Sequence, residues 1–325
     1  METQECEHVP DDLARRLVVL EHAEAPPLNP ELVDIALRID PHAELVHTRP
    51  LKGGVSAQMT VLEMRSPDGP GTRKILRRLP RPDAAATEFR LLQALRGTDA
   101  MAPVPHSLDP SGDYLVLEFV EADPVFAPAN VRGFVGQMAD RLAKIHRIDP
   151  SKLDLPVLPD LATRLVETRP SHPDDSLDEG RIREALEPLW PLPRSGQPVL
   201  LHGDFWPGNL LWKDDRLVAV VDWEDAQVGE RLADLAIARL DLLWMCGIDA
   251  MNEFTRRYAS LAAVDSTTLP YWDLWAALRP ASQIAEWAAG WPSHGRDDIT
   301  EATMRAAHRR FVNAAFAKLP GAPTG

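Results

Sequence analysis

A change in hydrophobic periodicity near residue 121 constrains the fold of this 325-residue chain more than any other feature. Before that point, short runs of alternating or β-branched residues predict strands at 44–50, 57–64, 74–79 and 114–120. Residues 84–95 lie between the last two of these strands and repeat their apolar side chains at helical spacing. This order predicts an antiparallel sheet that carries one helix.

Helical periodicity dominates after residue 121. It predicts a helix at 131–148 and further helices from 232 to the end. The proline-rich and acidic stretch 149–197 is expected to be irregular, with one helix near 178–189, and short strands are expected at 198–201, 209–212 and 217–221. We therefore expect an α+β, bilobal fold, with an antiparallel β-sheet N-terminal lobe at 1–121 and a mainly helical C-terminal lobe at 122–325.

Charge and cysteine content exclude several classes of protein. The net charge of −14 argues against a general nucleic-acid binder, which needs a basic surface, and is compatible with a cationic small molecule. Cys6 and Cys246 have no C-x-x-C spacing, so neither a disulfide framework nor a zinc site is indicated. The acidic N-terminus lacks the apolar region of a signal peptide, and charges interrupt the apolar stretch 232–248. We expect a cytoplasmic protein without nucleic-acid or membrane partners, and its oligomeric state stays open.

Polar residues of a chemically informative kind lie between apolar strands in the segment 198–224. Asp204 and Asn209 have the spacing D-x-x-x-x-N, and Asp222 ends an apolar strand after one short hairpin. Because apolar strands hold the loop on both sides, we expect these three side chains to converge on one point.

Two carboxylates and an amide in this arrangement suit phosphoryl transfer. Its transition state needs positioning and charge neutralisation more than covalent help. Asp204 can accept the proton of an attacking hydroxyl, while Asn209 and Asp222 supply hard oxygen ligands for Mg²⁺ beside the β- and γ-phosphates. His202 is expected to brace the loop rather than to react.

A metal-dependent oxygenase is the rival interpretation of this segment. His202 and Asp204 could join His294 or His308 in a 2-His-1-carboxylate iron site. Such oxygenases sit on jelly rolls, whereas the C-terminal part of this chain predicts helices, and the amide and second carboxylate stay unexplained. Phosphoryl transfer is therefore the favoured hypothesis.

At these residues the sequence resembles the aminoglycoside phosphotransferase and choline kinase family, which has a protein-kinase-like fold. The family motif H-G-D-x-x-x-x-N corresponds to residues 202–209, and I-D-[WF]-[EG] corresponds to residues 221–224. The resemblance implies a small-molecule kinase that transfers the γ-phosphate of ATP or GTP to a hydroxyl. It makes Asp204 the catalytic base and Asn209 and Asp222 the Mg²⁺ ligands. The alternative is a catalytically silent kinase-like protein that only binds a nucleotide.

The resemblance also implies phosphate-binding residues in the first lobe. Gly53, Gly54 and Ser56 lie between two predicted strands, where the family has its nucleotide loop. The segment KILRRLP resembles the phosphate-contacting strand and assigns that contact to Arg77, where aminoglycoside kinases usually have lysine. Strand alternation places Arg78 on the opposite face.

Further positions complete the expected nucleotide site. Glu88 lies in the next helix, where the family has an acid that pairs with the cation of the strand. Glu118 and Val120 occupy the hinge, where backbone C=O and N–H groups would bind adenine. Their side chains do not separate ATP from GTP.

The acceptor stays open, because family members phosphorylate aminoglycosides, macrolides, choline, amino alcohols and sugars. The short segment after Asp222 lacks the activation segment of protein kinases, so a peptide-docking surface is not expected. Glu224 and Asp225 are candidates to meet a cationic acceptor, and Trp287 is a candidate to stack on a sugar or aglycone. The competing interpretation is that the acids are merely solvated and the tryptophan is part of the core. Asp234 resembles a structural acid of the family's C-terminal lobe.

Overall fold

The computed structural model describes residues 28–51, 57–67, 69–81, 83–155, 160–192 and 196–319. They form two compact units. The first contains the described residues up to Arg49 together with Leu62–Arg73, and the second contains Pro50–Val61 and the chain from Lys74 onward. Helix α1 (Pro30–Ile39) belongs to the first unit and begins after Asn29, whose side chain accepts the backbone N–H of Glu31.

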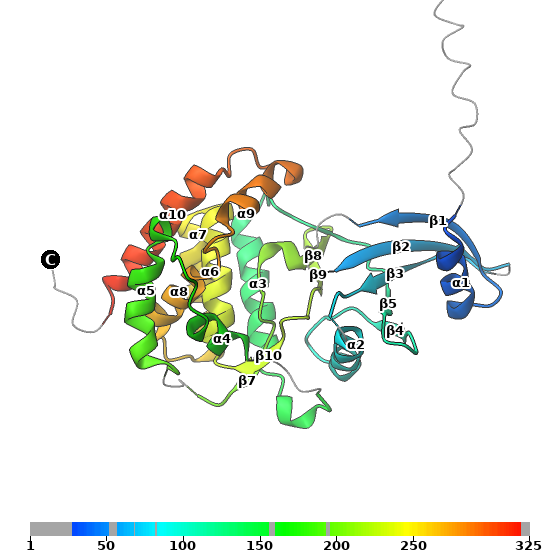
Figure 1. The fold of residues 1–325 in the computed structure, drawn as a ribbon, viewed down its shortest axis with the longest axis horizontal. Helices are drawn as coiled ribbons and strands as arrows, with labels where there is room; N and C mark the ends of the chain where they lie inside the picture. Colours follow the sequence, from blue (N-terminus) through cyan, green and yellow to red (C-terminus); the bar gives the residue numbers. More distant parts are fainter. Residues whose placement is uncertain are drawn as a thin grey trace, which may run out of the picture. The chain divides into compact units, whose positions relative to one another are not determined.

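The predicted antiparallel sheet with one helix is present. Its strand order is β1-β2-β3-β5-β4, with bounds Glu44–Pro50, Gln58–Arg65, Thr72–Arg78, Tyr114–Glu118 and Pro105–Leu108. Helix α2 (Ala84–Leu95) contacts β4 and β5 (Figure 1). Strand β4 was not predicted, because four residues that begin with a proline are too short to show alternation. In the second unit, β3 pairs with β5 so that Arg77 lies opposite Leu115.

The helices of the second unit pack in a chain of contacts around α6. Helix α3 contacts α7, α7 contacts α6, α6 contacts α8, and α8 contacts α10 (Figure 1). Their bounds are Val131–Ile145, Ile248–Ala262, Leu232–Cys246, Leu269–Ala277 and Glu301–Phe316. Helix α6 is apolar and buried on nearly every side, as its central place requires.

The stretch expected to be irregular contains more helix than the sequence indicated. Helix α5 (Glu179–Leu186) is the predicted one, but α4 (Leu161–Glu167) also forms after Asp160, whose side chain accepts the N–H of Thr163. Seven residues give two turns at most, which is too short for helical periodicity to be visible. Helix α9 (Ile284–Gly290) is equally short.

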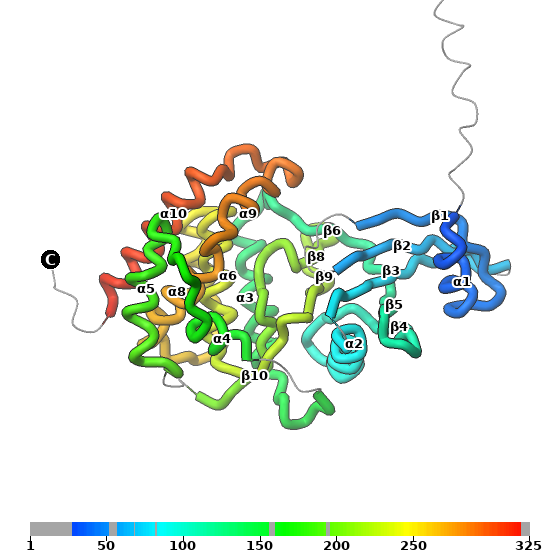
Figure 2. The backbone as a smooth tube through the Cα atoms, viewed as in Figure 1, coloured from blue at the N-terminus to red at the C-terminus, as the bar shows by residue number. Residues whose placement is uncertain are grey.

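Two small sheets hold the motif segment. Strand β7 (Val199–Leu201) pairs with β10 (Gln227–Gly229), and β8 (Leu210–Lys213) lies between β6 (Asp123–Pro124) and β9 (Arg216–Val220) (Figure 2). The antiparallel hairpin β8–β9 pairs Leu210 with Val220. The residues just before β8 and just after β9 are therefore neighbours.

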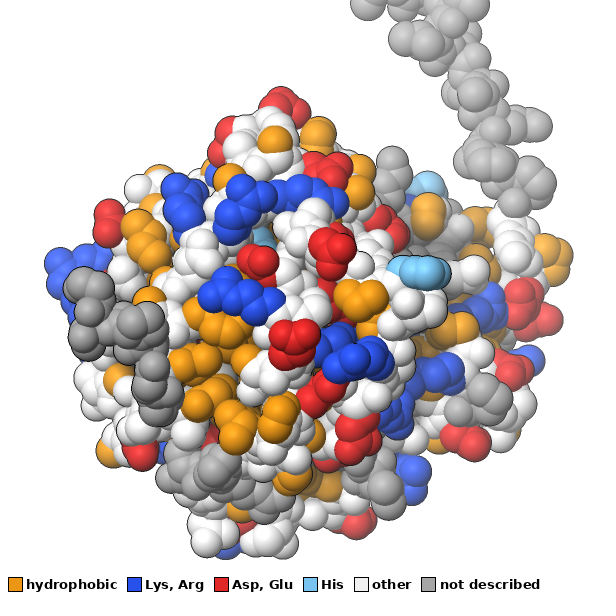
Figure 3. Space-filling model, turned by 60° about the vertical axis from the view of Figure 1, so that its left-hand side comes forward, with side chains coloured by type: hydrophobic (Ala, Val, Ile, Leu, Met, Phe, Trp, Pro, Cys, Tyr) orange, Lys and Arg blue, Asp and Glu red, His pale blue; other side chains and the backbone are white. Residues whose placement is uncertain are grey.

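Charges of both signs lie on the surface. On the face shown in Figure 3, acidic and basic side chains are intermixed beside exposed apolar ones, so the net negative charge does not form a single acidic field on that face. Within the part of the chain that the structure describes, no helix has both the length and the apolar character needed to cross a bilayer.

Candidate active site

The loop between β7 and β8 is fixed by a carboxylate at the start of α6. Asp234 accepts the backbone N–H of His202 at 2.7 Å and that of Gly203 at 2.9 Å, and His146 Nε2 lies 3.1 Å from it. Burial opposes ionisation of Asp234, but these donors outweigh it and lower the pKa of the carboxyl. The residue is fully buried and stays ionised, so its role is structural.

His202 is committed to backbone contacts on both ring nitrogens. Its Nδ1 accepts the N–H of Asp204 at 3.3 Å, so the ring proton lies on Nε2, which donates to the Val221 carbonyl at 2.9 Å. The ring also packs on Trp223, with centroids 4.7 Å apart. His308 Nε2 lies 2.9 Å from the Ala277 carbonyl. These contacts leave no nitrogen of His202 for iron, which removes the oxygenase interpretation.

Left-handed backbone positions shape the loop that carries Asp204 and the segment that carries Asp222. Gly203 has φ +85°, and a Cβ there would overlap the carbonyl oxygen of Asp225. Asp222 also has positive φ, at 66°, which is unfavourable for a residue with a side chain. Such strain persists only where the surroundings hold it, and it concentrates at functional sites.

Asp204, Asn209 and Asp222 are brought together as the spacing predicts. Asn209 Nδ2 donates to the backbone carbonyl of Asp204 at 3.0 Å and to its carboxylate Oδ2 at 3.1 Å. The N–H of Val221 donates to the Asn209 backbone carbonyl at 2.9 Å, which places the backbone of the next residue, Asp222, close to that of Asn209. Both hydrogens of the amide point towards Asp204, so its Oδ1 is directed elsewhere.

The oxygen atoms of Asn209 and Asp222 fit a hard cation. Asn209 Oδ1 accepts no hydrogen bond from any residue that the structure describes, and Asp222 uses only Oδ1 in its contact with Arg77. Carboxylate and amide oxygens are the donors that Mg²⁺ takes in phosphoryl-transfer sites. Among the described residues, no group of three or more His, Cys, Asp or Glu could hold a metal by itself.

Arg77 is the hub of a buried ion cluster. Its Nε lies 2.9 Å from Glu88, and its Nη2 lies 2.6 Å from Asp222 and 2.7 Å from Glu224. The guanidinium is 4% exposed. Burial opposes its charge, but the three carboxylates outweigh burial and raise the pKa of Arg77. The pairing expected between Arg77 and Glu88 is therefore present.

One cation cannot neutralise three carboxylates, and the pKa of the buried Glu88 is raised. Burial raises the pKa of Glu88 to about 7, with Asp222 and Glu224 acting in the same direction and Arg77 opposing them. The neighbouring Arg78 lies instead with its guanidinium over the ring of Tyr114, 5.7 Å from the ring centroid. The two arginines thus separate as alternation predicts.

Arg279 is the site residue that sequence reasoning missed. It follows α8 and forms an ion pair with Asp204, 75 residues away in the sequence. No motif signals it, because the contact depends on how α8 packs. Two further carboxyls lie in this electrostatic environment: burial raises the pKa of Asp241 to about 7, and burial together with Asp204 raises that of Asp225 to about 6.

In the predicted hinge, residues 118–120, one backbone N–H has no acceptor among the described residues. Glu118 donates its N–H to the Val104 carbonyl, and its side chain pairs with Lys74 at 2.6 Å. The Val120 carbonyl accepts the N–H of Ala122. No described residue accepts the N–H of Val120, so that donor stays available.

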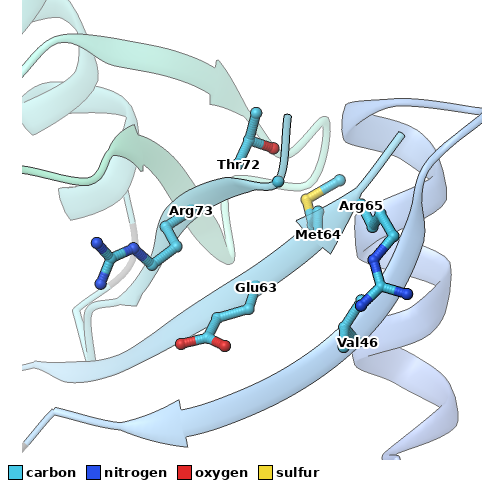
Figure 4. Close-up of a pocket in the computed structure, with 7 residues that line it drawn as sticks. Val46, Glu63, Met64, Arg65, Thr72 and Arg73 are labelled. Carbon is cyan, nitrogen blue, oxygen red and sulfur yellow. The ribbon is translucent and has the colours of Figure 1, made fainter. Parts of the chain in front are cut away.

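Some predicted positions do not join this cluster. Gly53, Gly54 and Ser56 lie outside the described residues. Trp287 packs against Trp244 with ring centroids 6.2 Å apart, and no described contact links it to Asp204. A pocket of about 330 Å³ on the first unit, lined by residues of β1, β2 and the start of β3, contains none of the predicted site residues (Figure 4).

The fold and these side chains define a protein of the protein-kinase-like class. The model of the phosphotransferase enzyme family matches residues 47–308. This chain therefore belongs to the phosphotransferase enzyme family.

Solved structures agree on the fold. The apoenzyme of macrolide 2'-phosphotransferase MphH from Brachybacterium faecium is 20% identical and superposes with a TM-score of 0.55 over 90% of this chain and 99% of that one. Choline kinase LicA from Streptococcus pneumoniae is 14% identical, with a TM-score of 0.59 over 88% and 99% of the chains. The GDP complex of aminoglycoside 2'-phosphotransferase-IIIa is 16% identical, with a TM-score of 0.60 over the same shares. The predicted protein-kinase-like, α+β fold is confirmed.

Sequence relatives are much longer proteins. Acyl-CoA dehydrogenase family member 10 of Mus musculus is 29% identical over 186 residues, which are 50% of this chain and 17% of that protein. Acyl-CoA dehydrogenase family member 11 of Pongo abelii is 32% identical over 96 residues, which are 24% of this chain and 12% of that protein. The chain thus spans less than a fifth of the length of these relatives.

Proposed function

We propose that this phosphotransferase is a small-molecule kinase that transfers the γ-phosphate of ATP or GTP to a hydroxyl of a small acceptor. The observation that carries the proposal is the convergence of Asp204, Asn209 and Asp222 within one compact unit, beside the buried cation Arg77. Two carboxylates, an amide and a fixed guanidinium are the groups that phosphoryl transfer requires.

Each residue has a part in the reaction. Asp204 takes the proton of the acceptor hydroxyl as its oxygen bonds to the γ-phosphorus; the bond from that phosphorus to the bridging oxygen breaks, and the nucleoside diphosphate leaves. Asn209 Oδ1 and the carboxylate of Asp222 hold Mg²⁺, which supplies positive charge at the phosphates. Arg77 binds phosphate oxygens, and Glu88 keeps its side chain in place.

Nucleotide binding is assigned to the first 121 residues and acceptor binding to residues 122–325. The Glu118 carbonyl and the Val120 N–H are assigned to the base, and Gly53, Gly54 and Ser56 are assigned to phosphate binding. The GDP complex of aminoglycoside 2'-phosphotransferase-IIIa and the streptomycin-ATP complex of APH(2")-IIa support a nucleotide as co-substrate. Because both guanine and adenine nucleotides occur among these similar structures, ATP and GTP both belong to the proposal.

The acceptor is a hydroxylated small molecule. The similar structures include enzymes named for macrolides, aminoglycosides and choline, so an antibiotic and a metabolite are both in scope. Glu224 and Asp225 lie near the cluster and suit a cationic acceptor, whereas Trp287 has no described link to it. The cytoplasm, where ATP and GTP are abundant, is the proposed site of action.

The test measures nucleotide consumption with a panel of hydroxylated antibiotics and metabolites, with Mg²⁺ and either ATP or GTP. Asp204→Asn should lower kcat by about 10²–10⁴, because a positioned base is lost, while nucleotide affinity changes little. Asp215→Asn, on the exposed turn of the β8–β9 hairpin, is the matched control and should keep the wild-type kcat.

The outcomes are distinct. Retention of more than about a tenth of kcat by Asp204→Asn would exclude Asp204 as the base. Binding of nucleotide by the wild type without consumption on any acceptor would favour the catalytically silent alternative.

A further inference from the structure

Arg279 holds one oxygen of the Asp204 carboxylate, and Asn209 holds the other. The Nη2 of Arg279 forms an ion pair with Asp204 Oδ1, and Asn209 Nδ2 lies 3.1 Å from Oδ2. Asp204 is the only hydrogen-bond partner of this guanidinium among the residues that the structure describes. Its Nε and Nη1 donors are therefore uncommitted, and the side chain is 22% exposed.

The guanidinium of Arg279 stays protonated. Burial opposes its charge, but Asp204, Asp241 and Asp225 outweigh burial and raise the pKa of Arg279. The contrast with Arg77 is informative, because Arg77 spends Nε and Nη2 on three carboxylates and lies 3.6 Å from a methionine sulfur with Nη1. Arg279 is therefore a cation beside the proposed base Asp204, and N–H donors of its guanidinium have no partner among the described residues.

We propose that Arg279 is a catalytic residue whose guanidinium edge away from Asp204 binds oxygen atoms of the phosphoryl group in transfer while one hydrogen of Nη2 stays on Asp204. This inference rests on the proposed function. The acceptor oxygen must lie within hydrogen-bond reach of Asp204 and about 3–3.5 Å from the phosphorus. A guanidinium bonded to that same carboxylate is then within reach of the phosphoryl oxygens.

The chemistry favours an arginine at this position. Negative charge spreads over the three equatorial oxygens as the phosphoryl group moves between the bridging oxygen and the acceptor oxygen. A planar guanidinium has two bidentate edges, Nε with Nη2 and Nη1 with Nη2. With one hydrogen of Nη2 on Asp204, the other edge can donate two parallel hydrogen bonds to such oxygens, and a guanidinium already fixed by an ion pair needs no reorganisation. The proton of the acceptor goes to Asp204, the nucleoside diphosphate leaves with the electrons of the broken bond, and Arg279 keeps all its protons.

The test uses mimics of the ground state and of the transition state, so it needs no acceptor. Wild type, Arg279→Gln and Arg279→Lys are titrated by calorimetry with a non-hydrolysable triphosphate and Mg²⁺, and separately with ADP or GDP, Mg²⁺ and aluminium fluoride. Arg305→Gln is the control, because Arg305 is also partly buried and ion-paired, with Glu301. Melting curves without ligand show whether each variant is folded.

We expect Arg279→Gln to weaken the aluminium fluoride complex by up to about 10²–10³-fold and the triphosphate complex by less than about threefold. Arg279→Lys, which keeps the charge but loses the fork, should lie between wild type and Arg279→Gln, and Arg305→Gln should match the wild type. If Arg279→Gln does not fold, the lysine variant alone decides by the same ratio of affinities.

Equal weakening of both complexes, or of neither, overturns the inference and leaves Arg279 with a structural role. With an acceptor in hand, a rise in KM for that acceptor at unchanged kcat would also overturn it, because the guanidinium would then bind a group of the acceptor. Absence of nucleotide binding by the wild type is a different result, since it overturns the proposed function itself.

Discussion

At the scale of single residues, the distribution of cations decides the chemistry of the site. Arg77 is surrounded by Glu88, Asp222 and Glu224, so its side chain is fixed before any ligand arrives. In the proposed function, phosphates compete with Asp222 and Glu224 for the same Nη2 atom. A divalent cation that takes up Asp222 would free one hydrogen of that atom while Glu224 keeps the other, which would couple metal binding to phosphate binding.

The two arginines of β3 give an internally controlled prediction. Arg77→Ala should lower the free energy of unfolding by about 3–5 kcal/mol, because buried carboxylates lose their cation. It should also lower kcat/KM by about 10²–10³. Arg78→Ala removes a contact with the Tyr114 ring and no ion pair with Glu88, Asp222 or Glu224, so it should cost less than Arg77→Ala. Urea denaturation and steady-state kinetics measure both effects, and a silent Arg77→Ala beside a crippled Arg78→Ala would contradict the assignment.

At the scale of elements, helix α6 connects the helical core to the loop that carries Asp204. Its first turn supplies Asp234, which accepts two backbone N–H groups of the loop that leads to Asp204, and the rest of the helix is buried. The loop is therefore anchored by hydrogen bonds to a buried helix of the second unit. Its position does not depend on the contacts of exposed side chains.

Removal of this anchor should cost both stability and rate. Asp234→Ala leaves the N–H groups of His202 and Gly203 without an acceptor in a buried place, at about 1–3 kcal/mol each. We expect a fall in melting temperature and in kcat. Asp249→Ala is the control, because Asp249 also lies in the first turn of a helix, α7, but is exposed. Similar losses of melting temperature and kcat in both variants would mean that a negative charge at the helix terminus, and not the contact with the loop, causes the effect.

Elements and contacts differ in how far the sequence predicts them. Long patterns such as 44–50 and 84–95 were predicted with nearly correct bounds, and the motif spacing placed Asp204 beside Asn209. Strands β4 and β6 and helix α4 were missed, because so few residues show no period, whereas the short strands β7 and β8 were predicted at 198–201 and 209–212. Arg279 was missed for a different reason: its partner lies 75 residues away, and only the packed structure brings them together.

At the scale of the whole molecule, buried carboxyls determine how stability depends on pH. The pKa is raised to about 7 for Glu88 and Asp241 and to about 6 for Asp225, with burial as the main cause. Unfolding returns the pKa of each group to its ordinary value near 4. Between about pH 4 and pH 7 the unfolded chain therefore binds fewer protons than the folded one. Their contribution to stability is full at about pH 4 and is lost as the pH rises through about 7.

These three groups should therefore lower the stability of the ligand-free protein as the pH rises from about 4 to about 7, by up to about 1.4 kcal/mol per pH unit for each group, against the opposite contribution of His308, whose pKa burial lowers. Asp241→Asn should flatten this slope, because an amide has no proton to release. Asp215→Asn, on an exposed turn, should leave it unchanged. Denaturation midpoints measured across this range test the sign, and a stability that rises steadily with pH would contradict it.

The double use of the His202 ring fixes the spacing of two segments of the site. One nitrogen accepts the N–H of Asp204 and the other donates to the carbonyl just before Asp222, so a single imidazole spaces the proposed base from the proposed metal ligand. Both contacts are to backbone, which every substituted neighbour retains. Substitution of neighbouring side chains can therefore change what the site binds without altering the backbone spacing between Asp204 and Asp222.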